Sequence, residues 1–442
     1  MSTSPQAAIH ESPYTTPAGR RIRDAVAELV PLIRKNALEG ERLGCLPPET
    51  LQALHATAEL LRHGDAEYAG RMQEFGGEAL GARDLAEIIS TVARGDGSAG
   101  WTTMIASGFA RVMLTFPEAA VADVYGRVAE WPGPVVASAS LFSDKIQRAR
   151  RVEGGYVVAK GNQWGFGSGS KHAAFLVVGA EVESEEGQVE RLMVLLEKGQ
   201  YEIVEDWQVM GLSGSSSNSI RTAEEVFMPA HRVAALAEFP QRLDELHKRF
   251  RGPGYALVDG RGLMLIVAMD TMAITLGMAQ GAFECFVEQS RQRKPFNLPY
   301  DTVAATPSVQ VVAGKTRAMI NAAQALIFSR ADYIDRKAAA GEPFGAAEEA
   351  EIMMDLVHAG NVCGAAIDMI QIAVGSSTVS LRNPIQRFAR DVRVALTHGS
   401  TRLDPAAEIS GRQLMGLPPF SSGMAAVPGV DKANKKAAAI AA

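Results

Sequence analysis

Cysteine is scarce in this sequence, and charge of one sign is nowhere concentrated. The 442 residues include three cysteines, Cys45, Cys285 and Cys363, and none has the C-x-x-C spacing of a metal or redox site. Reduced thiols of this kind are usual in the cytosol, so we predict a cytoplasmic protein. The net charge of -6 and the lack of Lys/Arg-rich blocks argue against nucleic acid as a partner.

Long hydrophobic runs are also few. The first twenty residues are polar with scattered prolines and lack the apolar stretch of a signal peptide. The most apolar run, residues 262–279, is interrupted by Asp270 and Thr271. This interruption predicts a buried core helix rather than a membrane span, and we expect no membrane partner.

The sequence carries no self-contained catalytic motif. It has no P-loop, no G-x-S-x-G elbow and no H-E-x-x-H, and its eight histidines lack the spacing of metal ligands, so we predict no metal site. The run Gly165-Phe166-Gly167-Ser168-Gly169 precedes a predicted strand, which the dinucleotide-binding fingerprint does not do. A protein without its own nicotinamide motif must receive electrons or activation from elsewhere.

The periodicity of apolar residues changes twice along the chain. Helical spacing begins near Arg20, with Ile22, Val26 and Ile33 on one face, and it returns after about residue 259. Between these parts the sequence predicts short strands at residues 135–142, 156–160, 173–182, 191–196, 201–209 and 219–227. The later helices are predicted at residues 260–292, 302–340, 346–374 and 384–397, with a short one near 408–415.

This order implies separate layers rather than alternating β-α-β units, and a chain of this length is expected to form two or three domains. We predict an α+β multidomain fold. An N-terminal helical domain covers residues 18–131, a compact β-barrel or sandwich covers 132–235, and a C-terminal helical bundle covers 255–417. Residues 1–17 and 428–442 are predicted to be mobile tails.

One stretch, residues 154–180, combines two apolar strands with a Gly/Ser loop that contains Trp164 and Phe166. Glycines and small hydroxyl side chains let backbone N–H groups approach a flat ligand closely, and the aromatic rings supply apolar faces for it. A tight hairpin with core aromatic residues gives the same pattern. The stretch alone therefore leaves a ligand site and ordinary packing equally open.

Several motifs occur in an order typical of one family. They are FGG at residues 75–77, GDGSAGW at 95–101, the Trp-containing loop of residues 154–173, DWQVMGLSGSSSNS at 206–219, EEVFMP at 224–229, SRQRKPF at 290–296 and RFARDVRVALTHGST at 387–401. Over residues 20–417 the chain resembles the acyl-CoA dehydrogenase superfamily, and most closely its two-component flavin-dependent monooxygenases. The resemblance implies an acyl-CoA dehydrogenase-like fold whose C-terminal domain is a four-helix bundle.

The resemblance places two catalytic residues, His398 and Ser168. Dehydrogenases of the superfamily commonly carry a glutamate where this sequence has His398, and in the monooxygenase branch a histidine there assists oxygen transfer or accepts a proton from a phenol. A histidine that only caps the preceding helix is the alternative. Ser168 matches the residue that hydrogen-bonds flavin N5; a turn-forming serine is the alternative, and Ser170 competes for the assignment.

The resemblance also implies contacts to cofactor and substrate. Arg293 matches an arginine that reaches the flavin phosphate of a neighbouring subunit, with Arg291 as the competing choice and a solvated face as the alternative for both. For the aromatic residues, the alternative to ligand contact is core packing. For His172, the alternative is a structural hydrogen bond. The implied flavin contacts are Trp164, Phe166, Ser168, Gly169 and Arg293, and the implied substrate pocket contains Trp101, Phe109, Ser140 and His172.

The implied function is that of the oxygenase component of a two-component monooxygenase. A separate NAD(P)H-dependent flavin reductase supplies FMNH2 or FADH2, O2 forms a C4a-hydroperoxyflavin, and a small phenol-like or fused-ring aromatic molecule is hydroxylated. Relatives are commonly homotetramers, which the long helices fit. Two segments beside the expected pocket, residues 141–144 and 213–218, depart from the family pattern. The substrates of the family therefore cannot be assigned to this chain. The alternatives are an N- or S-oxygenase, an acyl-CoA dehydrogenase-like flavoenzyme and a catalytically silent scaffold.

Overall fold

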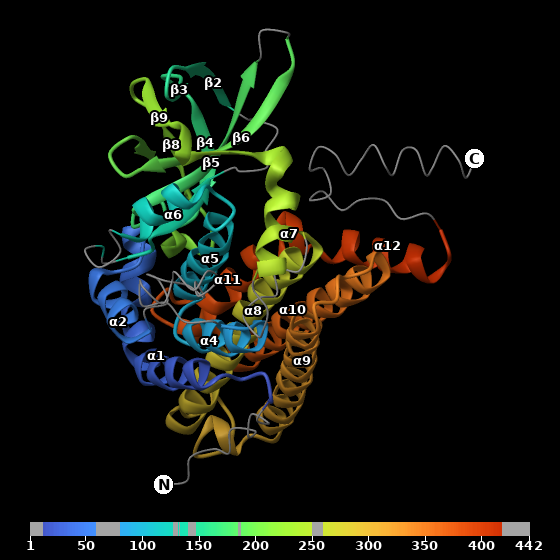
Figure 1. Ribbon diagram of the computed structural model, residues 1–442. Coiled ribbons are helices and arrows are strands. Elements are labelled where there is room, and N and C mark those ends of the chain that lie inside the picture. Colours follow the sequence, from blue (N-terminus) through green and yellow to red (C-terminus); the bar gives the residue numbers. More distant parts are fainter. Residues whose placement is uncertain are drawn as a thin grey trace.

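A computed structural model of the chain describes residues 12–58, 80–126, 131, 133–139, 147–183, 187–249 and 260–417. The strands gather at one end of the molecule, and the helices form the rest of it beneath them (Figure 1). Among the long helices are α8 (Gly260–Gln292), α9 (Pro307–Ala340) and α10 (Ala346–Val374), and the helices before the strands lie beside them.

The helices that precede the strands begin and end at capping residues visible in the sequence. Thr16 caps α1 by accepting from the Gly19 N–H at 2.9 Å, and the left-handed Gly44 ends that helix. Asp96 caps α5 by accepting from the Ala99 N–H at 3.0 Å. These helices are α1 (Pro17–Leu43), α2 (Pro48–Ala58), α4 (Ala82–Ala93), α5 (Gly97–Met113) and α6 (Glu118–Tyr125).

The segment just before α1 is held in place, although the sequence predicts a mobile tail through residue 17. The Ser12 hydroxyl donates to Asp332 Oδ1 on α9 at 2.7 Å. Thr16 donates its N–H and its hydroxyl to the two carboxylate oxygens of Asp84 on α4, at 2.9 and 2.8 Å. The prediction is therefore wrong for residues 12–17, and residues 1–11 lie outside the described part of the chain.

The strands form two sheets. In the larger sheet the order is β10-β6-β5-β2-β3-β9, with β1 paired in parallel to β5, and the smaller sheet has the order β4-β8-β7. The strands are β1 (Val136–Ala139), β2 (Gln147–Val152), β3 (Gly155–Val158), β4 (Gln163–Gly167), β5 (Phe175–Glu183), β6 (Val189–Glu197), β7 (Glu202–Val204), β8 (Asn218–Arg221), β9 (Val226–Pro229) and β10 (Val233–Ala235).

The structure differs from the predicted strands at several places. Residues 163–167, predicted as a loop, form β4, and the polar sequence QRARRV forms β2 although its charges hide the strand pattern. The predicted strand 219–227 is two strands, β8 and β9, which pair in different sheets. The predicted strand 201–209 is regular only over β7, and Trp207 beyond it hydrogen-bonds Asn218 instead of continuing the ladder.

After the strands, α8, α9, α10 and α11 (Pro384–Leu396) agree closely with their predicted ranges. The last helix, α12 (Leu403–Leu414), begins earlier than the helix predicted near residues 408–415, and α7 (Phe239–Arg249) was not predicted. By length and composition, α8 and the segment Ala346–Val379 are apolar enough to span a membrane. In α8, however, 89% of the apolar window is buried inside the protein, as predicted for a core helix.

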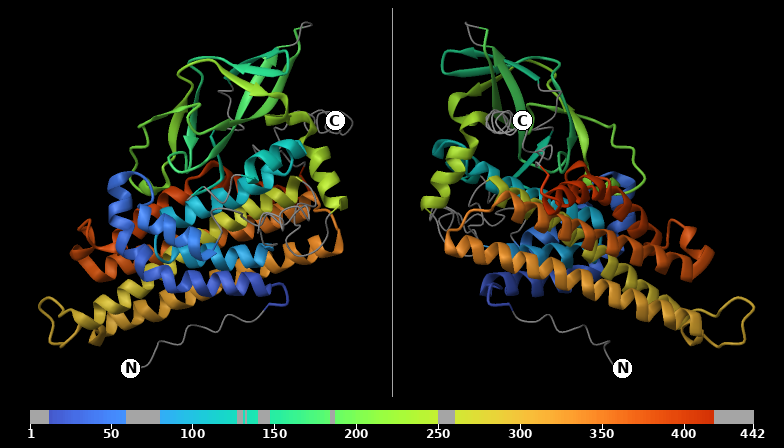
Figure 2. Two further views of the ribbon diagram at one scale, coloured as in Figure 1. Left: turned by 60° about the vertical axis from the view of Figure 1, so that its left-hand side comes forward. Right: turned by 90° about the vertical axis from the view of Figure 1, so that its right-hand side faces the viewer.

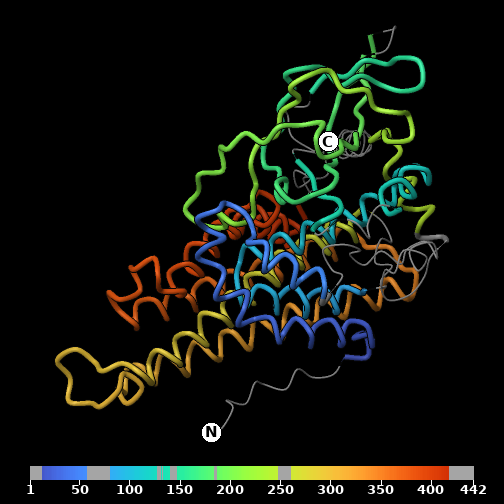
Figure 3. The backbone as a smooth tube through the Cα atoms, turned by 90° about the vertical axis from the view of Figure 1, so that its left-hand side faces the viewer, coloured from blue at the N-terminus to red at the C-terminus, as the bar shows by residue number. Residues whose placement is uncertain are grey.

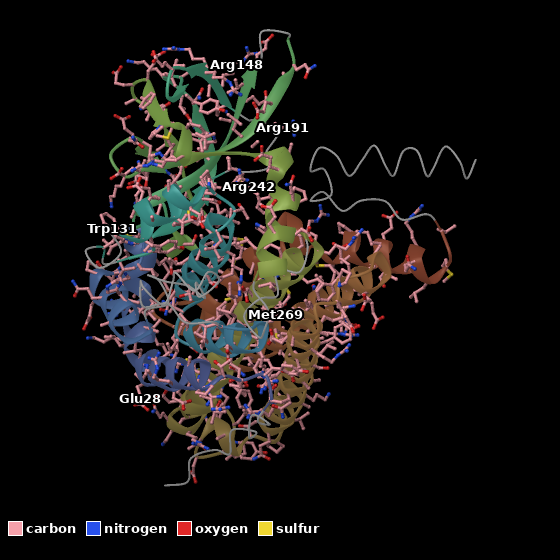
Figure 4. All side chains as sticks on the ribbon, in the orientation of Figure 1. Glu28, Trp131, Arg148, Arg191, Arg242 and Met269 are labelled. Atoms are coloured by element: carbon pink, nitrogen blue, oxygen red, sulfur yellow. The ribbon has the colours of Figure 1, made fainter. Side chains whose placement is uncertain are left out.

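One hydrophobic core serves the helices from both ends of the chain. It joins Ile22 of α1 and Ile89 of α4 to Met269 of α8, Ile327 of α9 and Ile367 of α10, all nearly inaccessible to solvent. Figures 2 and 3 show the N-terminal helices lying directly against the later ones. In Figure 4, Met269 lies among the helices, whereas Arg148 and Arg191 lie among the strands. The two helical regions therefore stabilise each other.

Candidate active site

A continuous line of contacts joins His398 to Ser168 through Trp101. The ring of His398 lies edge-on to the ring of Trp101, with the centroids 5.4 Å apart. The Trp101 indole N–H donates to the Ser168 hydroxyl at 3.2 Å. Ser168 in turn shares a hydrogen bond of 2.7 Å with Ser217, and Ser217 shares one of 2.8 Å with Ser215. Four segments far apart in the sequence meet along this line.

The local backbone explains how these side chains converge. The ladder between β4 and β8 shifts register between Trp164 and Gly167, and Phe166 within the shift has a φ of 57°. On the opposing segment, Leu212 and Ser216 have φ values of 54° and 55°. A left-handed conformation is costly for such residues, and strained positions and bulges cluster at functional sites. Gly169, whose φ of 76° suits glycine, donates its N–H to the Ser215 carbonyl at 2.8 Å.

The two competing serines have different surroundings. The Ser170 hydroxyl is 1% exposed and donates to the Ser216 carbonyl at 3.0 Å, so it is committed to holding the turn. The Ser168 hydroxyl accepts from Trp101 and pairs with Ser217. If Ser217 donates in that pair, the proton of Ser168 remains available to a ligand, because a hydroxyl accepts two hydrogen bonds and donates one. The geometry therefore favours Ser168 as the ligand contact.

His398 follows α11, and although the residue as a whole is exposed, its ring packs against Trp101. Its Nδ1 hydrogen-bonds the Ser400 hydroxyl at 2.7 Å, so the side chain does not cap the helix as the alternative assignment requires. Desolvation by the surrounding protein lowers the pKa of His398 below its usual value of 6.5. The imidazole is therefore neutral at pH 7 and able to accept a proton.

The aromatic residues predicted to face the flavin separate into two kinds. Trp164 is completely buried in the core of the strand region, and its indole N–H donates to the Gly179 carbonyl at 2.7 Å. It cannot wall a ligand, and the core-packing alternative holds for it. Phe166 is 74% exposed and lies edge-on to Trp207, with ring centroids 6.3 Å apart. The sequence motif at residues 206–219 contains Trp207, but nothing in it shows that this ring meets Phe166.

The remaining predicted pocket residues lie away from the line of contacts. Phe109 is two turns after Trp101 on α5 and is partly buried against a second hydrophobic cluster. The His172 carbonyl accepts the indole N–H of Trp131 at 2.8 Å, and burial, assisted by Lys198, lowers the pKa of His172 to about 4. Its Nε2 is buried without a hydrogen-bond partner in the described structure. Ser140 lies outside the described residues.

Arg293 lies at the end of α8, where the α8–α9 connection points away from the strands (Figure 2). It is half-buried, and its guanidinium donates to the Ser377 hydroxyl at 2.7 Å. Arg291, the competing choice, is exposed. No described contact joins either arginine to Trp101, Ser168 or His398. Within one chain, the structure does not bring the predicted phosphate contact to the site.

The residues of the site fit a reduced flavin. Ser168 offers a hydroxyl with remaining hydrogen-bonding capacity, Phe166 and Trp207 offer apolar ring surface, and the backbone at Gly169 lacks a Cβ. His398 adds a neutral acid-base group next to Trp101. Sequence reasoning missed Ser215, Ser217 and Trp207, although all three lie in the motif at residues 206–219.

The structure has an acyl-CoA dehydrogenase-like fold. The family model described as "Acyl-CoA dehydrogenase, C-terminal domain" matches residues 271–402. The structure of XiaF from Streptomyces sp., in complex with FADH2 and glycerol, superposes with a TM-score of 0.78 at 22% identity, covering 91% of this chain and 97% of that one. These matches confirm the predicted α+β fold of helices, strands and a helical C-terminal region.

Curated relatives narrow the class. The chain is 27% identical over 399 residues to the oxygenase subunit HsaA, a flavin-dependent monooxygenase of Mycobacterium tuberculosis, covering 89% of this chain and 95% of the relative. It is 23% identical over 408 residues to the oxygenase component of p-hydroxyphenylacetate 3-hydroxylase from Acinetobacter baumannii, covering 91% and 90%. The chain is a homologue of the oxygenase components of flavin-dependent monooxygenases, as its resemblance predicts.

Proposed function

We propose that this protein is the oxygenase component of a two-component monooxygenase that hydroxylates a small aromatic molecule. The main support is the line of contacts His398–Trp101–Ser168, in which an imidazole and a serine hydroxyl lie on either side of one indole ring. When bound, the reduced flavin supplies the electrons that activate O2 for transfer of one oxygen atom. A separate NAD(P)H-dependent flavin reductase, working with it in the cytoplasm, provides that flavin.

The side chains of the site then have distinct tasks. His398 accepts the proton of a phenol at Nε2, since its Nδ1 is engaged with Ser400. Trp101, 7% exposed, fixes the distance between the imidazole and Ser168. Ser168 holds a hydrogen bond to the flavin ring and is itself held by Ser217. A flavin that keeps this bond in a site shielded from water releases less hydrogen peroxide.

The serine assignment predicts a clear difference between two variants. Ser168→Ala removes the hydroxyl that receives the Trp101 N–H, and we expect hydrogen peroxide release per NADH to rise several-fold, with product formation falling by about 10-fold. Ser170→Ala is the matched control, because its hydroxyl supports only the Ser216 turn. Peroxide and product are measured together in the reconstituted system. Equal effects of both substitutions would contradict the assignment.

The first experiment combines the purified protein, a flavin reductase, NADH, and FMN or FAD, and it measures hydroxylation of phenols and fused-ring aromatics by mass spectrometry. Product that contains one oxygen atom from labelled O2 supports the proposal. Oxidation of amine or sulfur substrates alone would favour the N- or S-oxygenase alternative. Bleaching of bound oxidised flavin by an acyl thioester would favour the dehydrogenase alternative, and failure to bind either flavin would favour a scaffold.

The substrate is proposed to lie along one face of α5. Trp101, Ile105 and Gly108 are spaced i, i+4 and i+7 and therefore share this face. Ile105 contacts both the helical core and the core of the strand region, so the face lies where the two cores meet. No described atom comes within 4 Å of a Cβ placed on Gly108. This open space is suited to the second ring of a fused aromatic molecule.

Substitution of Gly108 is predicted to change selectivity by size. We expect Gly108→Leu to raise KM for fused-ring substrates at least 10-fold while single-ring phenols are affected less than about 3-fold, because the leucine fills the open space. Gly411→Leu in α12 is the matched control, since Gly411 is a helical glycine with equally open surroundings. Both variants gain helix propensity. A change in the preference between fused-ring and single-ring substrates that occurs only in Gly108→Leu is therefore due to the filled space and not to helix stability. An equal loss for both ring sizes would contradict this placement.

We further propose a homotetramer in which Arg293 reaches the flavin of a neighbouring subunit. The apolar segment Ala346–Val379 is only 33% buried over its apolar window, and Ile372 and Val379 on it are 80% and 76% exposed. Ser377, which binds Arg293, lies on the same segment. Exposed apolar surface of this kind favours association. Light scattering tests the proposal, and a mass near the 47.1 kDa of one chain would contradict it.

A further inference from the structure

Two buried carboxylates lie where three of the four segments of the site meet. Asp96 begins α5, which carries Trp101, and Asp391 lies on α11, which leads to His398. The third segment is the turn at Leu212 that leads to Ser215 and Ser217. Asp96 is 5% exposed and Asp391 is 3% exposed.

Asp391 binds two of these segments directly. Its Oδ1 accepts the Leu212 N–H at 2.6 Å, which holds a residue with a φ of 54°. Its Oδ2 is buried and has no hydrogen-bond partner in the described structure. A Cβ placed on Gly97, at the start of α5, would come within 3.0 Å of that oxygen. Asp391 therefore touches the first turn of α5 at a position where only glycine fits.

The positive charge around the two carboxylates is limited. Arg387, one turn before Asp391 on α11, is 5% exposed, and its Nε is 4.0 Å from Asp96 Oδ1. Arg390 is half-buried, donates to the Met210 carbonyl and is paired with Glu41 of α1 at 2.9 Å, so its charge is shared with another carboxylate. Met278 of α8 contributes only an apolar thioether against Gly97. Two buried carboxylates thus face one close guanidinium, a balance that favours retention of one proton.

We propose that Asp96 and Asp391 are positioning residues whose two carboxyls together retain one proton, and that this single protonation fixes the first turn of α5 against α11 and the Leu212 turn. Burial raises the pKa of both carboxyls, and for Asp391 the charge of Asp96 raises the pKa further. Loss of the retained proton leaves two negative charges in the junction. Their repulsion moves α5, and with it Trp101, away from His398 and Ser168.

The direction of the pH effect follows from the raised pKa. A carboxyl whose pKa is higher in the folded state stabilises the fold at low pH, and this contribution is lost as the pH rises through the folded-state value. Burial also raises the pKa of Asp335 on α9 to about 7, so the stability that Asp335 contributes is likewise lost as the pH rises. The comparison must therefore be between variants and the native protein at each pH.

The experiment compares the full-length protein with Asp391→Asn and Asp96→Asn between pH 5.5 and 8.5. Asparagine keeps an oxygen for the Leu212 N–H but cannot ionise. We expect the melting temperature of the native protein to fall with pH by about 3 °C more than that of either variant. Asp368→Asn is the control, because Asp368 is an exposed partner of Arg393 on α10 and should follow the native curve. A constant offset at every pH would show a purely structural hydrogen bond and overturn the proposal.

The second readout rests on the proposed function. Above pH 7, where His398 is neutral, the ratio of hydroxylated product to NADH oxidised should fall with rising pH in the native protein and remain nearly constant in Asp391→Asn. The melting curves need neither flavin nor substrate. They therefore test whether the two carboxyls retain one proton even if the oxygenase reaction is not observed. If the melting curves differ as expected but the product ratio does not, the pair does not position the site. If Asp391→Asn fails to fold, Asp96→Asn provides the same two readouts.

Discussion

Replacement of His398 by alanine is expected to reduce hydroxylated product about 100-fold at pH 7.5, because a positioned acid-base group contributes on the order of 100-fold or more. Oxygen consumption in the presence of reduced flavin should continue, since His398 contacts Trp101 and Ser400 and supplies no part of the strand-region loop that holds Ser168. The expected result is NADH oxidation that yields hydrogen peroxide in place of product.

The control for this substitution is His358→Ala. His358 is an exposed histidine on α10, and its loss should change product formation less than 2-fold. In the native protein, product formation should decline on the acid side through a pKa below 6.5, because protonated His398 cannot accept the phenol proton. Product yields in His398→Ala within 3-fold of the native protein would remove His398 from the mechanism.

The second large effect is expected for Asp335→Ala, and it concerns stability. Asp335 lies on α9, is completely buried, and accepts the N–H groups of Ala82 and Arg83 at 2.7 and 2.8 Å. These N–H groups belong to the first turn of α4 and have no carbonyl partner within the helix. Alanine leaves both donors buried and unpaired, which costs about 2 to 5 kcal/mol. Thermal or urea unfolding measures this loss.

The dependence of this effect on pH gives a sharper test. Burial raises the pKa of Asp335 to about 7, so its stabilising contribution is largest below that pH and declines as the pH rises through it. The deficit of Asp335→Ala should therefore be larger at pH 5.5 than at pH 8.5. Asp332→Ala, at a half-buried position one turn earlier, should cost about 1 kcal/mol or less. A deficit that grows with pH would contradict the account.

The sequence predicts the helices well because their signals are local. Proline and glycine mark the ends of α9, and the predicted bounds of α10 agree with the structure. The placement of Trp164 and Phe166 is different. They are two residues apart and would face the same side of a regular strand, yet one is completely buried and the other is 74% exposed, because the left-handed backbone of Phe166 interrupts the alternation. The β4 register shift and the partner strand, which no local pattern reveals, decide which side is the core.

The site itself was only partly predictable. His398 and Ser168 follow from the resemblance, and the structure brings them to the two sides of Trp101. Ser215 and Ser217 occur within a serine-rich run whose serines have the same side-chain chemistry, so the sequence does not distinguish among them. What selects Ser217 is the left-handed turn at Ser216, a backbone conformation that the serine-rich sequence does not reveal. Arg293 remains a prediction, because the described contacts of one chain do not test it.

The position of α5 has a consequence for the design of chimeras between homologous enzymes. Its first turn meets the Asp96–Asp391 junction, and its Trp101 ring links the imidazole to the serine line. The face that continues from Trp101 leads to the open space at Gly108. Selectivity and coupling are therefore inherited together on one helix. A chimera that exchanges α5 alone between two homologues should transfer the substrate range of the donor, but it should waste reducing equivalents until residues 211–217 and 387–398 come from the same parent.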